Sequence, residues 1–91
     1  MAKASITVKY IGDVTFNPGD IADGDVAEVT ASIPGKQIRP GDMVLVNKGT
    51  EDDVYAIAAW VSDVDEITVT FFNPSGGNVD GDEQVLGVIV F

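Results

Sequence analysis

Apolar and polar residues alternate along most of this sequence, and this period of two constrains the fold more than any other feature. Successive side chains of a β-strand point to opposite faces, so the alternation predicts strands with one buried and one exposed face. Val, Ile, Thr and aromatic residues, which favour strands, make up most of these runs. The runs with this character are Ile6–Tyr10, Ala27–Ile33, Val44–Val46, Ile67–Phe71 and the nearly all-apolar Val85–Phe91.

Turn signals separate the runs, mostly at spacings of about 8–12 residues, which is typical of an all-β sandwich or small barrel. We therefore predict an all-β, single-domain β-sandwich or barrel over residues 1–91, jelly-roll or immunoglobulin-like, with about six to eight strands. Residues 1–30 either contribute strands or include an N-terminal arm. The turn signals are Asn17-Pro18-Gly19, Asp23-Gly24, Pro34-Gly35, Pro40-Gly41, Asn47-Lys48-Gly49, Asn73 to Gly77, and Asp80-Gly81.

Three features need a separate argument. Residues 54–61 contain three Ala, but eight residues are too few for a stable helix, and the Val, Tyr, Ile and Trp among them favour a strand. The last run would aggregate as an exposed edge, so we expect it either at the centre of a sheet or, in part, paired with another chain. Trp60, the only Trp, is expected to pack in the core rather than to stack on a ligand.

The charge of the chain is concentrated in its second half. Residues 49–91 carry nine acidic side chains and no Lys or Arg, whereas residues 1–48 carry six acids and five bases, so nearly all of the net charge of −10 belongs to one half. Such a field disfavours nucleic acids and anionic membranes, both of which recruit Lys and Arg. No run approaches the ~20 apolar residues of a membrane helix, and no signal-peptide block opens the chain. We expect a soluble protein made in a cytoplasm.

The residue types exclude most catalytic chemistry. The sequence contains no His and no Cys, which removes the commonest general base, the strongest nucleophile, disulfides and most zinc sites. Carboxylate pairs like those of glycosidases remain an alternative, but a domain of 91 residues rarely offers a pocket that perturbs two of them. We predict that the chain is not an enzyme and uses no cofactor.

Four acidic clusters suggest Ca²⁺ binding as one interpretation. The spacing within residues 20–25 differs from the alternating ligands of an EF-hand, and no helices are predicted beside it. We favour the interpretation that the clusters are solvated turns, and we predict no metal site. The clusters are residues 20–25, 51–53, 63–66 and 80–83.

A series of motifs resembles the small β-domains of tailed-phage virion proteins. Together they cover about two thirds of the chain and are similar to head decoration (cement) proteins, head fibres and related appendages. Residues 1–30 match no part of this pattern, and no catalytic or metal residue follows from the resemblance. The motifs are Ile33-Pro34-Gly35, Pro40-Gly41-Asp42-Met43-Val44-Leu45-Val46-Asn47-Lys48, Ala59-Trp60-Val61-Ser62, Asp65-Glu66-Ile67-Thr68-Val69-Thr70-Phe71, Asn73 to Asp80, and the terminal Val88–Phe91.

The resemblance implies a structural virion protein, a decoration or cement protein that binds the major capsid protein on the outer face of a phage head and stabilises it. The alternative is a tail or fibre appendage domain that binds host-surface carbohydrate. Such decoration proteins are commonly trimers, so we expect a homo-oligomer, with a trimer favoured, on the capsid surface of the virion. For docking to an acidic shell we predict the cations Lys36, Arg39 and Lys48, with the acid-only half of the chain facing outward.

Overall fold

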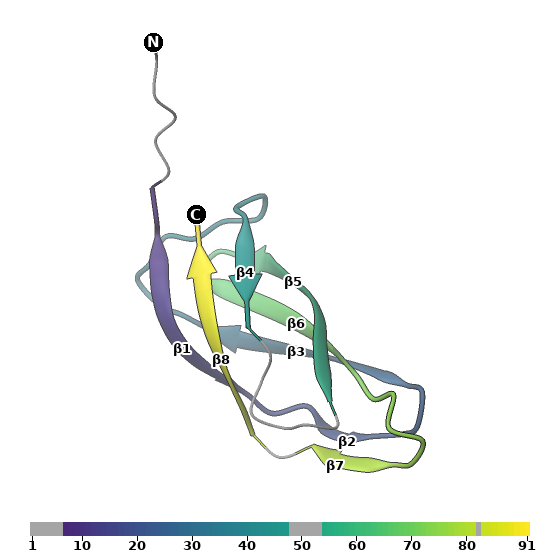
Figure 1. Ribbon diagram of the computed structural model, residues 1–91. Coiled ribbons are helices and arrows are strands. Elements are labelled where there is room, and N and C mark those ends of the chain that lie inside the picture. Colours follow the sequence, from purple (N-terminus) through teal and green to yellow (C-terminus); the bar gives the residue numbers. More distant parts are fainter. Residues whose placement is uncertain (1–6, 48–53, 82) are drawn as a thin grey trace.

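The chain folds into β-strands joined by turns (Figure 1), as seen in a computed structural model that describes residues 7–47, 54–81 and 83–91. The described residues form eight strands and no helix, so the prediction of a small all-β fold is confirmed. Consequently none of them belongs to a helix with the length and apolarity needed to cross a membrane. The strands are β1 (Tyr10–Phe16), β2 (Gly19–Ile21), β3 (Val26–Ser32), β4 (Val44–Val46), β5 (Tyr55–Asp63), β6 (Glu66–Phe72), β7 (Val79–Gly81) and β8 (Gln84–Val90).

Two three-stranded antiparallel sheets form the body of the domain. One has the strand order β1-β8-β4 and the other β3-β6-β5, and in Figure 1 the first lies in front of the second. The apolar core includes Phe16 and Phe71, which meet edge to face with ring centroids 6.2 Å apart. β8 is the middle strand of its sheet, so the expectation of a central position for the last run is confirmed. The buried apolar residues are Val14, Phe16, Ile21, Ile33, Ile38, Val54, Val61, Ile67, Val69, Phe71, Leu86, Val88 and Val90.

β2 and β7 extend the β1–β8 pairing beyond the two sheets. The register is the same on both sides of the break between the two ladders. Pro18 interrupts the ladder because it has no N–H, and Gly19 follows it with φ 67° and donates its N–H to Oδ1 of Asn17 at 3.1 Å. Two turn predictions are therefore wrong. The segment around Pro18 bends a continuing ribbon without reversing it, and Asp80 and Gly81 lie within β7.

The first strand begins later than the alternation predicts. β1 runs from Tyr10 to Phe16, whereas the predicted strand ended at Tyr10, and Ile6 lies outside the described residues. The strand was not predicted beyond Tyr10 because Gly12 and Asp13 belong to residue types that are depleted in strands. The structure gives Gly12 a packing role, since a Cβ built on it would lie 2.8 Å from the Tyr10 hydroxyl.

The prediction that Trp60 packs in the core is wrong. Trp60 lies on the outer side of the β3-β6-β5 sheet and is 38% exposed. The cause is a β-bulge: the β5–β6 register shifts between Ala56 and Ala58, so Ile57 is an extra residue. One extra residue exchanges the two faces of the strand beyond it, and Val61 therefore takes the buried position that strict alternation from Ala56 would give to Trp60.

Asn73 is fully buried and organises the end of the molecule where β2 and β7 pair. Its Nδ2 donates to the carbonyls of Ile21 at 2.8 Å and Gly77 at 2.7 Å, and its Oδ1 accepts from the N–H of Ser75 at 3.0 Å. Its backbone N–H and C=O bond to the turn at residues 24–25. The Asn73 side chain thus joins the turn at residues 73–77 to β2, and its backbone joins the same turn to residues 24–25.

We expect Asn73→Ala to lower the free energy of unfolding by about 3 kcal/mol, because it removes three hydrogen bonds made by a fully buried side chain, among them the buried one to the Ile21 carbonyl. Urea unfolding followed by fluorescence measures the change. Asn17→Ala is the matched control, since Asn17 is exposed and its side chain accepts one hydrogen bond, so its loss should amount to about 1 kcal/mol or less. Equal losses in the two variants would contradict this role of Asn73.

Candidate docking site

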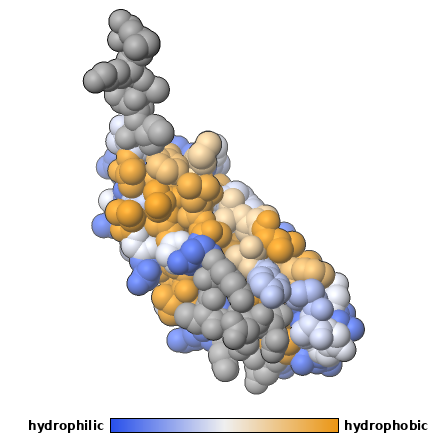
Figure 2. Space-filling model, in the orientation of Figure 1, coloured by the Kyte–Doolittle hydropathy of each residue, from blue (hydrophilic) through white to orange (hydrophobic). Residues whose placement is uncertain are grey.

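The outer side of the β1-β8-β4 sheet carries a row of exposed apolar side chains. Cross-strand pairing places Ile11 of β1 and Leu45 of β4 on either side of Ile89 in β8. Ile11 is 70% exposed, Leu45 52%, and Met43, just before β4, 63%. Figure 2 shows a hydrophobic area over these strands. We call the surface formed by Ile11, Met43, Leu45, Gly87 and Ile89 the docking face.

Gly87 creates a hollow in the docking face because the middle strand carries no side chain at this point. The hollow has a volume of about 420 Å³ and is lined by the apolar row together with Asp13 and Asn47. The Asn47 side chain borders the hollow and lies against Gly87, since the backbone N–H of Asn47 donates to the Gly87 carbonyl at 3.1 Å and its Oδ1 accepts from the Gly87 N–H at 2.8 Å. A Cβ on Gly87 would lie 2.9 Å from Nδ2 of Asn47, so a larger residue would displace this amide.

The docking face is nearly free of charge although the chain is strongly acidic. Among the outward positions of β1, β8 and β4, Asp13 is the only charged residue. The cores of protein–protein interfaces are likewise depleted of charge and enriched in large apolar residues. Contiguous exposed apolar patches of this kind mark interaction sites on soluble proteins. The face therefore has the composition of a surface that another macromolecule covers.

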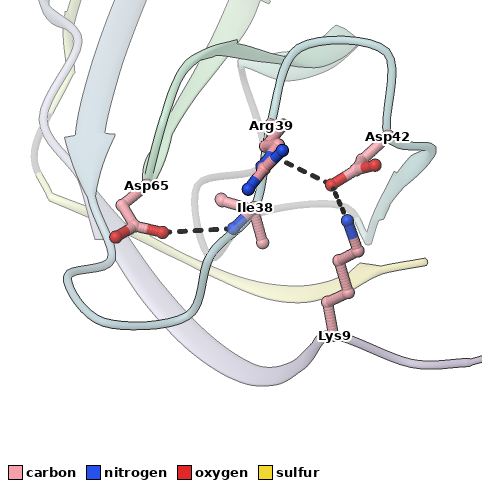
Figure 3. Close-up of polar contacts among 5 residues, drawn as sticks. All are labelled: Lys9, Ile38, Arg39, Asp42 and Asp65. Carbon is pink, nitrogen blue, oxygen red and sulfur yellow. Dashed lines mark hydrogen bonds and ion pairs between the residues drawn. The ribbon is translucent and has the colours of Figure 1, made fainter.

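Three cations lie around the start of β1 and β4, and Figure 3 shows two of them, Lys9 and Arg39. Lys9, just before β1, donates from Nζ to Oδ2 of Asp42 at 2.8 Å, which is the one ion pair formed between described residues. Because Asp42 precedes β4, this pair links the two strands that flank β8. The N–H of Arg39 donates to the same Oδ2 at 2.9 Å. The Nζ of Lys36 lies 6.0 Å from the ring centroid of Tyr10, at the start of β1.

Lys36 lies against the ring of Tyr10, whose side chain packs toward the core and not onto the docking face, and Arg39 lies next to Asp42 before β4. Lys48 lies outside the described residues, and the docking role of all three cations stays a prediction. Lys9 was missed, because in the sequence it is only a polar position in an alternating run. The apolar row was missed as well. One signal for it was present, since Leu45 falls between Val44 and Val46 and must point away from the side that they share.

Asp65, in the turn between β5 and β6, anchors the loop that carries Lys36. Its Oδ2 accepts from the N–H of Gly35 at 3.0 Å and its Oδ1 from the N–H of Ile38 at 3.1 Å. Its backbone N–H donates to the Ile38 carbonyl, and its carbonyl accepts from the N–H of Ile33. Asp65 has φ 57°, a conformation that Asp adopts more readily than most residues. The loop is therefore held against the core, where Ile38 is fully buried.

The carboxyl group of Asp42 has a pKa below its ordinary value. The hydrogen bond from Lys9 is the largest cause that lowers its pKa, followed by the backbone N–H of Arg39. Both interactions favour the charged form of the carboxylate. The ion pair that links β1 to the turn before β4 is therefore intact at neutral pH.

The predicted division of the surface by sequence half is wrong. In the β1-β8-β4 sheet, β1 and β4 come from the near-neutral half and β8 from the acidic half. In the β3-β6-β5 sheet, β3 comes from the near-neutral half and β5 and β6 from the acidic half. Neither half forms a face of its own, because the antiparallel pairing interleaves them. What separates charge from apolar surface is the alternation within each strand.

No group of three or more acidic side chains positioned to hold a metal ion occurs in the described part of the chain. In the 20–25 cluster, Asp23 accepts from the N–H of Gly76 and Asp25 from the N–H of Val26, so both carboxylates cap turns. The 51–53 cluster and Asp82 lie outside the described residues.

Comparisons of this chain with protein-family models, with curated proteins and with solved structures gave no match. The function is therefore argued from the site itself.

Asp65→Ala is expected to lower the free energy of unfolding by about 2 kcal/mol, because two backbone N–H groups lose their acceptor and Ala adopts positive φ less readily. Asp65→Asn keeps one acceptor oxygen and a tolerance for this conformation, so it should cost about half as much. Urea unfolding gives both values. The control is Asp20→Ala at an exposed position in β2, for which we expect a change within about 0.5 kcal/mol. A loss for Asp65→Ala no larger than this would show that the carboxylate does not anchor the loop.

The Asp42 ion pair predicts a pH dependence with a defined sign. Because the pKa of Asp42 is lowered in the folded state, its contribution is fully present above the unfolded-state value of 3.8 and is lost as the pH falls through the folded-state value. The stability difference between the wild-type protein and Asp42→Asn should therefore be constant near neutral pH and shrink below pH 3.8. Urea midpoints measured over a pH series test this. A difference that stays constant into strong acid would argue against the ion pair.

Proposed function

We propose that this chain is a structural protein of a tailed-phage virion, a decoration or cement protein that binds the major capsid protein on the outer face of the head and stabilises it. The observation that carries the proposal is the docking face, an uncharged apolar surface on a chain of net charge −10. The motif order from Ile33 to Phe91 supports the choice of virion class.

The energetics of the docking face suit a contact repeated over a shell. Full burial of a large apolar side chain contributes about 1.5–3 kcal/mol, so covering Ile11, Met43 and Leu45 from their present exposure yields roughly 3–5 kcal/mol per copy. This is modest for a single complex. Repeated over many equivalent positions, or multiplied within an oligomer, it becomes a large stabilisation of the whole particle.

Lys36 and Arg39 supply the electrostatic part of the proposal. Lys36 lies against Tyr10 at the start of β1 and Arg39 next to Asp42 before β4, where they would meet acidic groups of the shell. Such contacts set orientation and accelerate association more than they add affinity. A homotrimer is the proposed assembly, since a decoration protein fits best on a symmetry axis of the shell. Each protomer then contributes one docking face.

The copy number of the chain in purified particles of its parent virus tests this proposal. Quantitative mass spectrometry against the major shell protein should give a simple ratio to the shell subunit. Only a few copies per particle would favour the second candidate, a tail or fibre appendage that binds carbohydrate, for which the exposure of Trp60 is the favouring observation. Absence from the particle would overturn both.

Leu45→Glu should weaken binding to the head at least about thirtyfold, because it places a charge in the apolar row beside Ile89. Val26→Glu is the matched control, since Val26 is 50% exposed in β3 of the other sheet and the change in charge is the same. Co-sedimentation with heads that lack this chain measures binding. Charge reversal at Lys36 and Arg39 should slow association. The docking face would be ruled out by equal binding of the two Glu variants.

A further inference from the structure

The outer side of the β3-β6-β5 sheet differs in composition from the docking face. Register places Trp60, Thr68 and Thr30 in one row across the three strands, and Ala58, Thr70 and Glu28 in the next row. Neighbouring strands lie about 4.8 Å apart, so each row spans about 10 Å. We call the surface formed by Glu28, Thr30, Trp60, Thr68 and Thr70 the hydroxyl face. It combines one large aromatic ring with several hydroxyl groups and a carboxylate.

The bulge at Ile57 presents the Trp60 indole to solvent on this face. Ala58, its neighbour on the same side of the strand, is too small to cover the ring. The indole N–H forms no hydrogen bond with any other described residue. The same holds for the Thr70 hydroxyl and the Glu28 carboxylate within the described residues. An aromatic surface and three unused hydrogen-bonding groups therefore lie on one side of one sheet.

A chain of hydroxyl groups gives the face a defined hydrogen-bond direction. The Thr68 hydroxyl donates to Oγ of Ser62 at 2.7 Å, and it lies 2.7 Å from Oγ1 of Thr30. A hydroxyl has one proton, so Thr30 must be the donor to Thr68, and the proton of Ser62 is left for a group outside the chain. Thr68 is buried, whereas Thr30 and Ser62 are exposed. The row thus offers a donor at one end and acceptor lone pairs at the other.

We propose that the hydroxyl face binds a neutral saccharide, with a sugar ring stacked on Trp60. The apolar C–H face of a pyranose fits an exposed indole, and its equatorial hydroxyls require both donors and acceptors at the rim. Ser62, Thr30, Thr70 and Glu28 supply these groups. Acidic residues and Ser are depleted in the cores of protein interfaces, so Glu28 and Ser62 make a second protein the poorer fit to this face.

Charge restricts the class of saccharide. The outward positions of β3, β6 and β5 carry Glu28, Glu66 and Asp63 and no Lys or Arg. An anionic sugar or a nucleic acid would therefore be repelled, both locally and by the net charge of −10. This face lies on the opposite sheet from the docking face, so binding at one leaves the other open. The inference deepens the second candidate function, carbohydrate binding, and does not depend on the decoration role.

Trp60 is the only Trp in the chain, so its fluorescence reports directly on the hydroxyl face. The full chain is titrated with neutral oligosaccharides of glucose, mannose, galactose and N-acetylglucosamine, and with sialylated and uronic-acid oligosaccharides for comparison. We expect a saturable change in Trp60 emission with at least one neutral oligosaccharide and none with the anionic ones. Absence of a response to every neutral oligosaccharide overturns the proposal. A shift of the emission with protein concentration alone also overturns it, because a second copy then covers the face.

Variants separate a specific site from nonspecific quenching. Glu28→Gln and Thr70→Val change little in shape and should each raise the dissociation constant about tenfold, while the thermal midpoint stays near that of the wild-type protein. Trp60→Ala should abolish binding measured by calorimetry. Leu45→Ser on the docking face is the matched control and should leave the dissociation constant unchanged. Unaltered binding in Glu28→Gln and Thr70→Val would overturn the assignment of the site.

Discussion

The pairing of the last strand with the first is the interaction on which the rest of the structure depends. β8 lies between β1 and β4 and buries Leu86, Val88 and Val90 in the core. Its partner β1 lies at the other end of the chain, so the loop that this pairing closes contains most of the sequence. Loop closure of this length must come before most of the core can form, which is the topology that makes small β-proteins fold slowly. The same ladder continues into β2 and β7, so loss of the β1–β8 pairing would also release the narrow end that Asn73 organises.

The alternation along β8 that fills the core also creates the docking face. With Val88 and Val90 turned inward, Gly87 and Ile89 must point outward, where pairing sets them beside residues of β1 and β4. An uncharged apolar sheet face exposes a protein to nonspecific association. The acidic groups elsewhere on the chain oppose this through mutual repulsion, which acts over about 8–10 Å at physiological salt. The large net charge therefore limits nonspecific association, and the small uncharged face remains available to a partner of complementary shape and charge.

The sequence was sufficient for β3, β4, β5, β6 and β8, but not for β1, β2 and β7 or for the pairing of the strands. Alternation located β3, β4, β6 and β8, and the argument against an exposed apolar edge placed β8 correctly. Alternation did not predict β1, because Gly12 suits the packing of the Tyr10 side chain and has a low strand propensity. It failed again at Trp60, because a single bulge exchanges the faces of a strand and leaves no mark in composition. The contact between Lys9 and Asp42 depends on which strands flank β8, and only the three-dimensional topology supplies that information.

The bulge at Ile57 shows how little sequence change decides between a buried and a presented aromatic ring. Without it, Trp60 would share the buried side of β5 with Ala56, and the outer face would carry Val61 instead. Leaving the indole 38% exposed forgoes part of the roughly 1.5–3 kcal/mol that burial of a large apolar side chain contributes. On a sheet face that contacts only water, a polar residue at position 60 would avoid the exposure of apolar surface. A large aromatic ring beside Thr70 and Glu28 gains its stabilisation when a ligand covers it, and that physical argument distinguishes this face from an ordinary solvated one.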